Sequence, residues 1–156
     1  MEIERKFLIE SAPGWLPEWP SERIEQGYLT ESVDSVQVRV RRKDGEAILG
    51  VKRGTGLSRE ETEVALAAGA AGELWELTEG RRVRKARYRV DHEGMTIEVD
   101  VFTDELEGLV VAEVEFDTEE ASAEFTGPEW LGREVTGERA YENECLAEEG
   151  LPEEPR

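Results

Sequence analysis

The chain has 156 residues, of which 38% are apolar and 37% are charged, and its formal net charge is −19. This length suits one domain with one core, while so strong an acidity excludes general charge attraction to nucleic acid or to anionic membranes. One cysteine excludes an internal disulfide, and one histidine excludes a zinc site built from several histidines.

Apolar residues recur with a period of two along most of the chain, which predicts about eight β-strands. In chain order, the predicted strands cover residues 1–8, 24–30, 36–41, 48–53, 60–66, 83–90, 95–101 and 109–116. Short turns such as Lys43-Asp44-Gly45 and His92-Glu93-Gly94 join several of them. Mostly antiparallel pairing is therefore expected.

Three helices are predicted beside these strands. The first covers residues 67–79 and stops at Gly80, and the last covers residues 139–149 and stops at Gly150. Between them, Asp117 and Glu120 are expected to cap a short helix through Phe125. No repeat or linker divides the chain, so we expect a single domain at residues 1–150 and a flexible tail at 151–156.

Most of the predicted strands have one apolar face and one face with charges of a single sign. Side chains at positions i and i+2 of a strand share a face, so each pair acts together. The acidic pairs are Glu2/Glu4, Glu61/Glu63, Glu98/Asp100 and Glu113/Glu115. The basic members are Lys6, Arg39/Arg41, Lys52 and Lys85/Arg87. A barrel closed from these strands points either the apolar faces or the charged faces inward.

The sorting of charge by strand favours a charged interior. Selection for a soluble surface would mix both signs along each strand. In the alternative closure, apolar side chains fill the barrel and the charge pairs form an ordinary solvated surface. A charged interior suits a metal-bridged polyphosphate, because carboxylates bind hard cations such as Mg²⁺ and Mn²⁺ while arginine and lysine bind phosphate oxygens.

The ordered set of motifs resembles the triphosphate tunnel metalloenzymes of the CYTH superfamily over nearly the whole chain. Glu2-Ile3-Glu4-Arg5-Lys6 is similar to the Glu-x-Glu-x-Lys signature that opens this family. The segments that match next, in order, are 24–29, 38–41, 51–52, 58–63, 85–88, 98–102 and 112–115. Residues 130–136 and 141–143 resemble the closing segment of the short bacterial members.

The resemblance implies an α+β, mainly β fold: an eight-stranded antiparallel closed tunnel with a charged interior and a few flanking helices. It also implies a divalent-metal-dependent enzyme that hydrolyses a triphosphate, and the closing segment favours inorganic tripolyphosphate, which yields pyrophosphate and phosphate. Class IV adenylate cyclase and thiamine triphosphatase are alternatives on the same fold. A non-catalytic binder of polyphosphate or nucleotide, and an ordinary barrel that binds an apolar ligand, are alternatives from other classes.

Carried onto this chain, the resemblance assigns two sets of site residues. The expected catalytic and substrate-binding cations are Lys6, Arg39, Arg41, Lys52, Lys85 and Arg87. The expected ligands of Mg²⁺ or Mn²⁺ are Glu2 and Glu4, with Glu113 or Glu115, for a first ion, and Glu61, Glu63 and Asp100 for a second that activates the attacking water. Glu98 is a further ligand or orients a neighbouring base.

Several basic residues and the C-terminal segment are treated separately. Arg59, Arg82 and Arg84 lie near turns or on the opposite strand face, so we place them outside the site in solvated or ion-paired roles. The family often has arginine where this chain has Ala140, and no lysine follows Lys85. Contact between substrate and the last helix therefore remains open.

The start of the chain indicates where the protein works. Met1 is followed by Glu2 and Glu4 rather than by an apolar run, and no stretch approaches the roughly 20 apolar residues of a membrane span. We expect a cytoplasmic protein, monomeric or homodimeric, whose partner is a small molecule that contains a triphosphate rather than nucleic acid or membrane.

Overall fold

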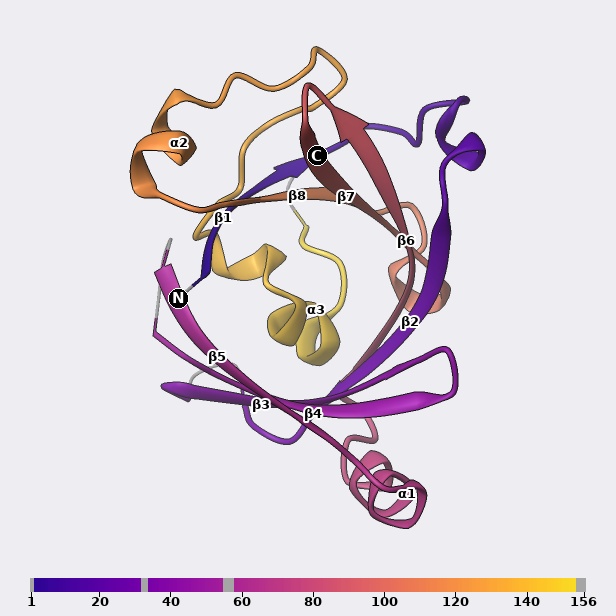
Figure 1. Cartoon of the computed structure of the whole chain (residues 1–156). Coiled ribbons are helices and arrows are strands. Elements are labelled where there is room, and N and C mark those ends of the chain that lie inside the picture. The colour runs from indigo at the N-terminus through magenta and orange to yellow at the C-terminus, as the bar shows by residue number, and fades with distance from the viewer. Residues whose placement is uncertain (1, 32–33, 55–57, 154–156) are drawn as a thin grey trace.

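A computed structural model describes residues 2–31, 34–54 and 58–153. In this part of the chain, eight antiparallel strands close into a barrel in the order β1-β5-β4-β3-β2-β6-β7-β8, with β8 paired back to β1 (Figure 1). The strands are β1 (Glu2–Leu8), β2 (Ser21–Tyr28), β3 (Val36–Lys43), β4 (Glu46–Arg53), β5 (Ser58–Ala65), β6 (Arg82–His92), β7 (Met95–Phe102) and β8 (Val110–Phe116). The predicted eight-stranded antiparallel tunnel is confirmed.

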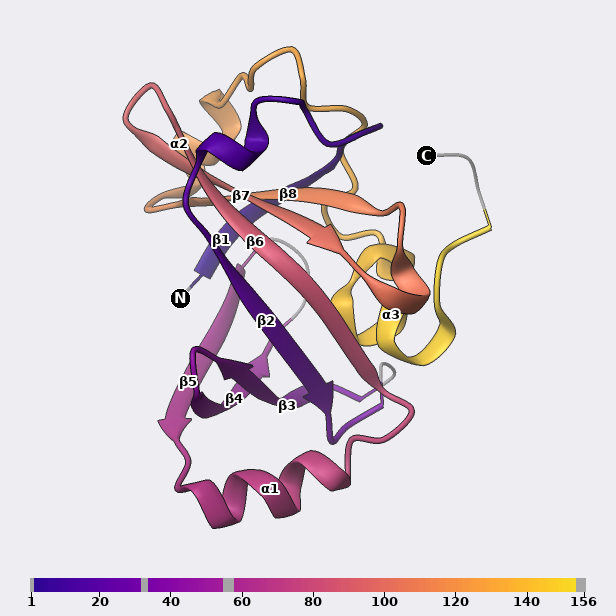
Figure 2. The same cartoon turned by 90° about the vertical axis from the view of Figure 1, so that its right-hand side faces the viewer.

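Over the described residues, three α-helices and three short 3-10 turns flank the barrel. Helix α1 (Ala68–Glu76) packs beside β3 and β4, α2 (Glu119–Glu124) packs beside β1 and β8, and α3 (Asn143–Glu149) lies at one end of the barrel next to β2 and β6 (Figures 1 and 2). The 3-10 turns are η1 (Leu16–Glu18), η2 (Asp104–Leu106) and η3 (Arg139–Tyr141). None of the helices in the described residues has the length and apolar character needed to cross a membrane.

The outer face of the barrel carries one of two apolar cores. Alternate residues of β7 and β8, such as Val99 and Val114, are buried here beneath loops that carry several tryptophans. Trp15 and Trp130 meet edge to face within this layer, with ring centroids 5.2 Å apart. The apolar faces therefore point outward under a cover of loops, which leaves the charged faces to line the interior, as the sorting of charge predicts.

The second apolar core closes one end of the tunnel. Leu8, Phe102 and Val111 each lie two residues beyond a charged position on their strands, so they point inward at the same end. They pack with Tyr141 and with Leu146 of α3 in one buried cluster. The interior is thus charged along its middle and apolar where the C-terminal segment covers it.

Several element boundaries differ from the sequence predictions by one to three residues. Strand β2 begins at Ser21, three residues before the predicted start. The cap of α2 is Thr118 rather than Asp117, because the Thr118 hydroxyl accepts a hydrogen bond from the Ala121 backbone N–H at 3.0 Å.

The predicted helix at 139–149 is interrupted at Glu142, whose ψ of 139° is extended. The preceding carbonyl, that of Tyr141, accepts a hydrogen bond from Lys6 Nζ at 3.2 Å. This contact with the barrel explains why two short helical segments replace the single predicted helix. Within the predicted tail, Leu151 packs against the second apolar core, while residues 154–156 lie outside the described part.

Candidate active site

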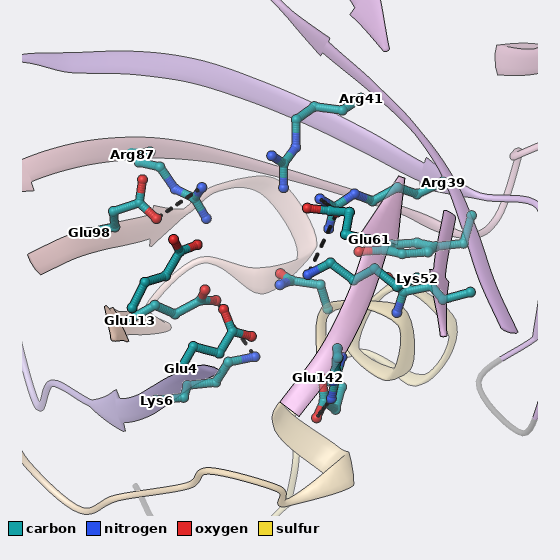
Figure 3. Close-up of a pocket in the computed structure, with 15 residues that line it drawn as sticks. Glu4, Lys6, Arg39, Arg41, Lys52, Glu61, Arg87, Glu98, Glu113 and Glu142 are labelled. Carbon is teal, nitrogen blue, oxygen red and sulfur yellow. Dashed lines mark hydrogen bonds and ion pairs between the residues drawn. The ribbon is translucent and has the colours of Figure 1, made fainter. Parts of the chain in front are cut away.

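The middle of the barrel holds a cavity of about 60 Å³, here called the tunnel cavity, whose wall is almost entirely charged or polar (Figure 3). Its cationic lining residues are Lys6, Arg39, Arg41, Lys52, Arg59 and Arg87. Its carboxylate lining residues are Glu4, Glu61, Glu98, Glu113, Glu115 and Glu142. Among the described residues, six positive and six negative side chains therefore face one another.

Part of the positive lining and part of the negative lining face each other across the tunnel cavity. Arg39, Arg41 and Lys52 project from β3 and β4, and they face Glu4, Glu98 and Glu113 on β1, β7 and β8 (Figure 3). The strand register explains the acidic side, because Glu4 lies directly opposite Glu115, and Glu98 lies directly opposite Glu113.

Ion pairs occupy much of this lining. Arg39 Nη2 lies 2.9 Å from Glu61 Oε2, and Lys52 Nζ lies 3.9 Å from the same oxygen. On the acidic side, Lys6 Nζ lies 3.7 Å from Glu113 Oε1. Although burial opposes ionisation, Lys6 and Arg87 lower the pKa of Glu113 to about 2. An incoming polyanion would therefore compete with carboxylates for the cations.

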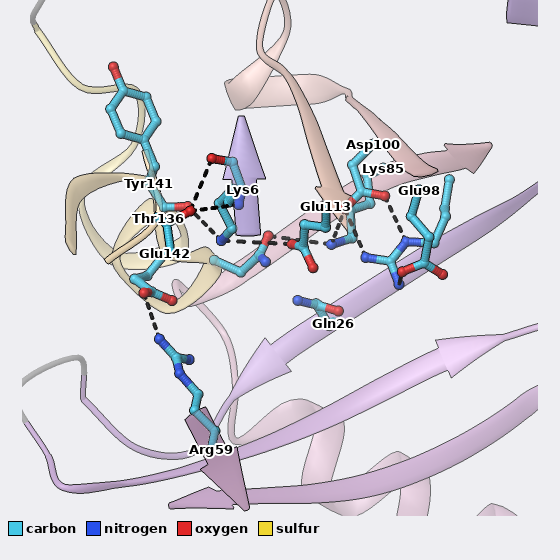
Figure 4. Close-up of polar contacts among 12 residues, drawn as sticks. Lys6, Gln26, Arg59, Lys85, Glu98, Asp100, Glu113, Thr136, Tyr141 and Glu142 are labelled. Atoms are coloured by element: carbon cyan, nitrogen blue, oxygen red, sulfur yellow. Dashed lines mark hydrogen bonds and ion pairs between the residues drawn. The ribbon is translucent and has the colours of Figure 1, made fainter. Parts of the chain in front are cut away.

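Arg87, which lines the cavity, belongs to a buried group with Lys85 and Asp100, two residues that are not part of the lining (Figure 4). Asp100 receives Arg87 Nε at 2.7 Å and lies 2.8 Å from Lys85 Nζ. Burial alone would raise the pKa of Asp100, but Arg87 and Lys85 hold it well below its ordinary value. Burial lowers the pKa of Lys85 to about 7. Asp100 favours the charged form of Lys85, but the Arg87 charge offsets part of that attraction.

Arg41 stands at the centre of a cluster of guanidinium groups. Burial, together with the charges of Arg39 and Arg87, lowers the pKa of Arg41 to about 10. Its Nε donates to the neutral amide oxygen of Gln26 at 3.0 Å, and Gln26 in turn donates to the Tyr28 hydroxyl at 2.6 Å. An anion beside Arg41 would offset the repulsion that its charge meets from the neighbouring guanidinium groups.

Sequence comparison matches the chain to a known family and to relatives of known activity. A family model described as the CYTH domain matches residues 1–144. The chain belongs to the CYTH family. An inorganic triphosphatase from Nitrosomonas europaea is 43% identical over 148 residues, which cover 94% of this chain and 96% of that protein. An inorganic triphosphatase from Acetivibrio thermocellus is 42% identical and covers 93% of this chain and 92% of that protein.

A solved structure that is similar in both fold and sequence supports the CYTH assignment. The crystal structure of an inorganic triphosphatase matches this chain with a TM-score of 0.72 and 37% identity, and the match covers 97% of both chains. The whole described CYTH barrel, including the C-terminal segment, therefore has a counterpart of known structure.

The CYTH tunnel brings ten of the predicted site residues to one cavity wall: Lys6, Arg39, Arg41, Lys52, Arg87, Glu4, Glu61, Glu98, Glu113 and Glu115. It leaves three others away from the wall. Lys85 and Asp100 are buried below it, and Glu63 is exposed although it shares the strand parity of Glu61. The side chain of Glu2 lies outside the described part.

The structure also corrects the placement of Arg59. Arg59 lies on the same face of β5 as Glu61 and lines the tunnel cavity, where its Nη2 is 2.6 Å from Glu142 Oε1. Its two-residue spacing from Glu61 was a usable signal. Arg82 and Arg84 do lie outside the cavity, where Arg82 stacks on Trp75 with its guanidinium carbon 4.5 Å from the ring centroid.

Sequence reasoning missed four further lining residues: Tyr28, Gln37, Glu142 and Asn143. Tyr28 and Gln37 share the inward parity of their strands but carry no charge, so the pattern of charge pairs gives no signal for them. Glu142 and Asn143 reach the cavity only because α3 covers the end of the barrel (Figure 1), which strand patterns do not reveal.

The donor chemistry of the acidic side fits a hard divalent cation. Glu4, Glu98, Glu113 and Glu115 project from three neighbouring strands into one cavity, and opposed carboxylates repel unless a cation lies between them. Over residues 2–31, 34–54 and 58–153, no three acidic, histidine or cysteine side chains already lie close enough together to enclose a metal ion. In particular, Glu61, Glu63 and Asp100 do not converge.

Proposed function

We propose that this CYTH protein is an inorganic triphosphatase that hydrolyses tripolyphosphate to pyrophosphate and phosphate with Mg²⁺ or Mn²⁺. The observation that carries the proposal is the tunnel cavity, in which a cationic side faces a carboxylate side. The two relatives that are 42% and 43% identical over most of their length, both inorganic triphosphatases, support the same reaction.

The cations would bind and orient the phosphate groups. Arg41, whose charge is opposed by the neighbouring guanidinium groups of Arg39 and Arg87, suits the non-bridging oxygens of a polyphosphate. Lys52 and Lys6 approach from neighbouring parts of the wall. As charge shifts toward the leaving phosphate, these fixed cations would stabilise the transition state without reorganising.

The carboxylates Glu4, Glu113 and Glu115, with Glu98 and the predicted Glu2, would hold the divalent cation. When bound, such a cation supplies positive charge to the phosphate oxygens and makes a water molecule more acidic. Lys85 would act from below the wall, because its contact with Asp100 helps fix the guanidinium of Arg87. No covalent bond between substrate and protein is required.

A phosphate-release assay tests the proposal. Tripolyphosphate, ATP and thiamine triphosphate are each incubated with the protein under Mg²⁺ or Mn²⁺, with and without a chelator. We expect metal-dependent release of phosphate from tripolyphosphate as the fastest reaction. Cyclic AMP as the main product from ATP would instead identify an adenylate cyclase, and preferred hydrolysis of thiamine triphosphate would identify that substrate.

A substitution at Glu4 distinguishes the proposed enzyme from a non-catalytic binder. Glu4→Gln removes a carboxylate from the acidic side while it leaves the cationic side intact. A binder would keep most of its affinity for tripolyphosphate and would show no turnover in either form. The proposed enzyme loses metal-dependent turnover, while Glu73→Gln, an exposed position on α1, keeps it.

A further inference from the structure

A second cavity of about 230 Å³, here called the side cavity, lies between α3 and the strands β3 to β5. Its wall differs from that of the tunnel cavity, because it combines charged groups with the backbone of Gly54 and Gly137 and with the side chains of Ser35 and Cys145. Such a mixed wall suits an organic group better than a bare phosphate.

The two cavities share part of one wall. Gln37, Lys52, Arg59 and Glu142 line both of them. The closest contact within this shared wall is the ion pair between Arg59 Nη2 and Glu142 Oε1, at 2.6 Å (Figure 4). The two side chains are 15% and 23% exposed, so the ion pair is largely withdrawn from solvent.

The carboxylate of Glu142 is held in place from both neighbouring residues. The carbonyl of Tyr141 accepts from Lys6 Nζ at 3.2 Å, and the Asn143 side-chain oxygen accepts from Lys85 Nζ at 3.4 Å. Three successive residues of the C-terminal segment are therefore each bound to a different cation of the barrel. Such a segment has little freedom to swing Glu142 out of the shared wall.

We propose that the Arg59–Glu142 ion pair determines substrate specificity by separating the tunnel cavity from the side cavity. With the ion pair closed, the tunnel cavity accommodates an unsubstituted triphosphate, and a triphosphate that carries a nucleoside has no room for its organic end. With the ion pair broken, the two cavities join and the side cavity receives that end. The inference rests on the proposed triphosphatase function.

The test compares two variants that break the ion pair from opposite sides. Glu142→Ala removes a negative charge and Arg59→Gln removes a positive charge, so a purely electrostatic effect on the two substrates would have opposite signs in the two variants. Opening of the shared wall would instead favour the nucleoside triphosphate in both variants. The readout is the ratio of kcat/KM for Mg²⁺–ATP to kcat/KM for Mg²⁺–tripolyphosphate.

We expect this ratio to rise about tenfold or more in both variants. Glu138→Ala is the matched control, because it removes an exposed ion pair with Arg133 from the same C-terminal segment and should leave the ratio unchanged. Circular dichroism confirms that each variant is folded, and Glu142→Ser, which also shortens the side chain in the shared wall, replaces Glu142→Ala if that variant unfolds.

The outcomes distinguish this inference from the proposed function. A parent protein that releases no phosphate from tripolyphosphate overturns the proposed function. A parent protein that is active, with variants whose ratio stays within about twofold of the parent or moves in opposite directions, overturns the role of the ion pair alone.

Discussion

Arg87 and Asp100 form a two-pronged ion pair between β6 and β7, with Nε to Oδ1 at 2.7 Å and Nη2 to Oδ2 at 2.9 Å. Lys85 Nζ lies 2.8 Å from the same carboxylate, so two buried cations share one anion below the tunnel cavity. This arrangement fixes the direction in which Arg87 presents its guanidinium to the cavity. Asp100 also compensates the buried positive charges of both Lys85 and Arg87.

Asp100→Asn should therefore destabilise the protein strongly. Removing one partner of a buried ion pair leaves an uncompensated charge, which costs about 3–5 kcal/mol in the free energy of unfolding. Urea denaturation in the presence of a chelator measures this loss. The control is Glu60→Gln, which removes a well-exposed partner of Arg53 and should change the free energy by less than about 1 kcal/mol. Equal effects from both variants would contradict the structural role of Asp100.

Arg39→Ala should reduce catalysis while the fold is retained. Arg39 belongs to the guanidinium cluster that faces the acidic side of the tunnel cavity, and loss of one fixed group that stabilises a transition state costs about 100-fold or more in rate. Steady-state kinetics with tripolyphosphate provide the measurement. Arg53→Ala, on the exposed end of β4, should match the parent. An Arg39→Ala protein with parental kcat/KM would remove this residue from the mechanism.

The two-residue period predicted about eight strands, the sorting of charge by strand favoured a charged interior, and the family resemblance implied the closed tunnel. Once the charged faces point inward, residues such as Arg41 and Glu113 must line the interior. Periodicity does not reveal depth, however. Lys85 and Asp100 share the inward face with Arg87 and Glu98, yet they pair with each other below the wall.

The remaining part of the site depends on contacts between distant segments. Glu142 reaches the tunnel cavity because the C-terminal segment folds back over the barrel and meets Arg59, 83 positions earlier in the chain. No local pattern encodes that distance. The prediction of a single helix over residues 139–149 failed for the same reason, since the helix breaks where the segment contacts the barrel.

Glu115→Gln should reduce the stabilisation that the protein gains from a bound divalent metal ion. Glu4 and Glu115 lie directly opposite each other on β1 and β8, so a cation bound between them would relieve the repulsion of their like charges. We expect the variant to be at least as stable as the parent in a chelator and to gain less stability from added Mn²⁺. Thermal unfolding with and without Mn²⁺ measures both effects. An unchanged gain in the variant would exclude Glu115 as a ligand.

Cys145 should react slowly with thiol reagents and should give the stability a defined pH dependence. Burial and the hydrogen bond from its Sγ to Glu149 Oε2 raise the pKa of the thiol to about 12. In the unfolded chain a thiol has a pKa of about 8.5. The stabilisation is therefore complete below about pH 8.5 and is lost as the pH rises toward 12.

Two measurements check this expectation for Cys145. Labelling by a disulfide reagent at pH 8 should be slow in the native protein and fast in urea. The free energy of unfolding should fall above about pH 8.5 more steeply in the parent than in Cys145→Ala. Identical slopes for the two proteins would show that another group titrates in this range.

The equal number of positive and negative side chains around the tunnel cavity has a consequence for how substrate arrives. Because the described lining is electrically balanced, the surplus of 19 negative charges belongs to the rest of the chain. A bare polyanion is therefore repelled at long range and attracted only at short range, by the cations that line the cavity. Added salt screens that repulsion, so moderate ionic strength should speed capture of tripolyphosphate, and a triphosphate that arrives already complexed to magnesium meets the smaller barrier.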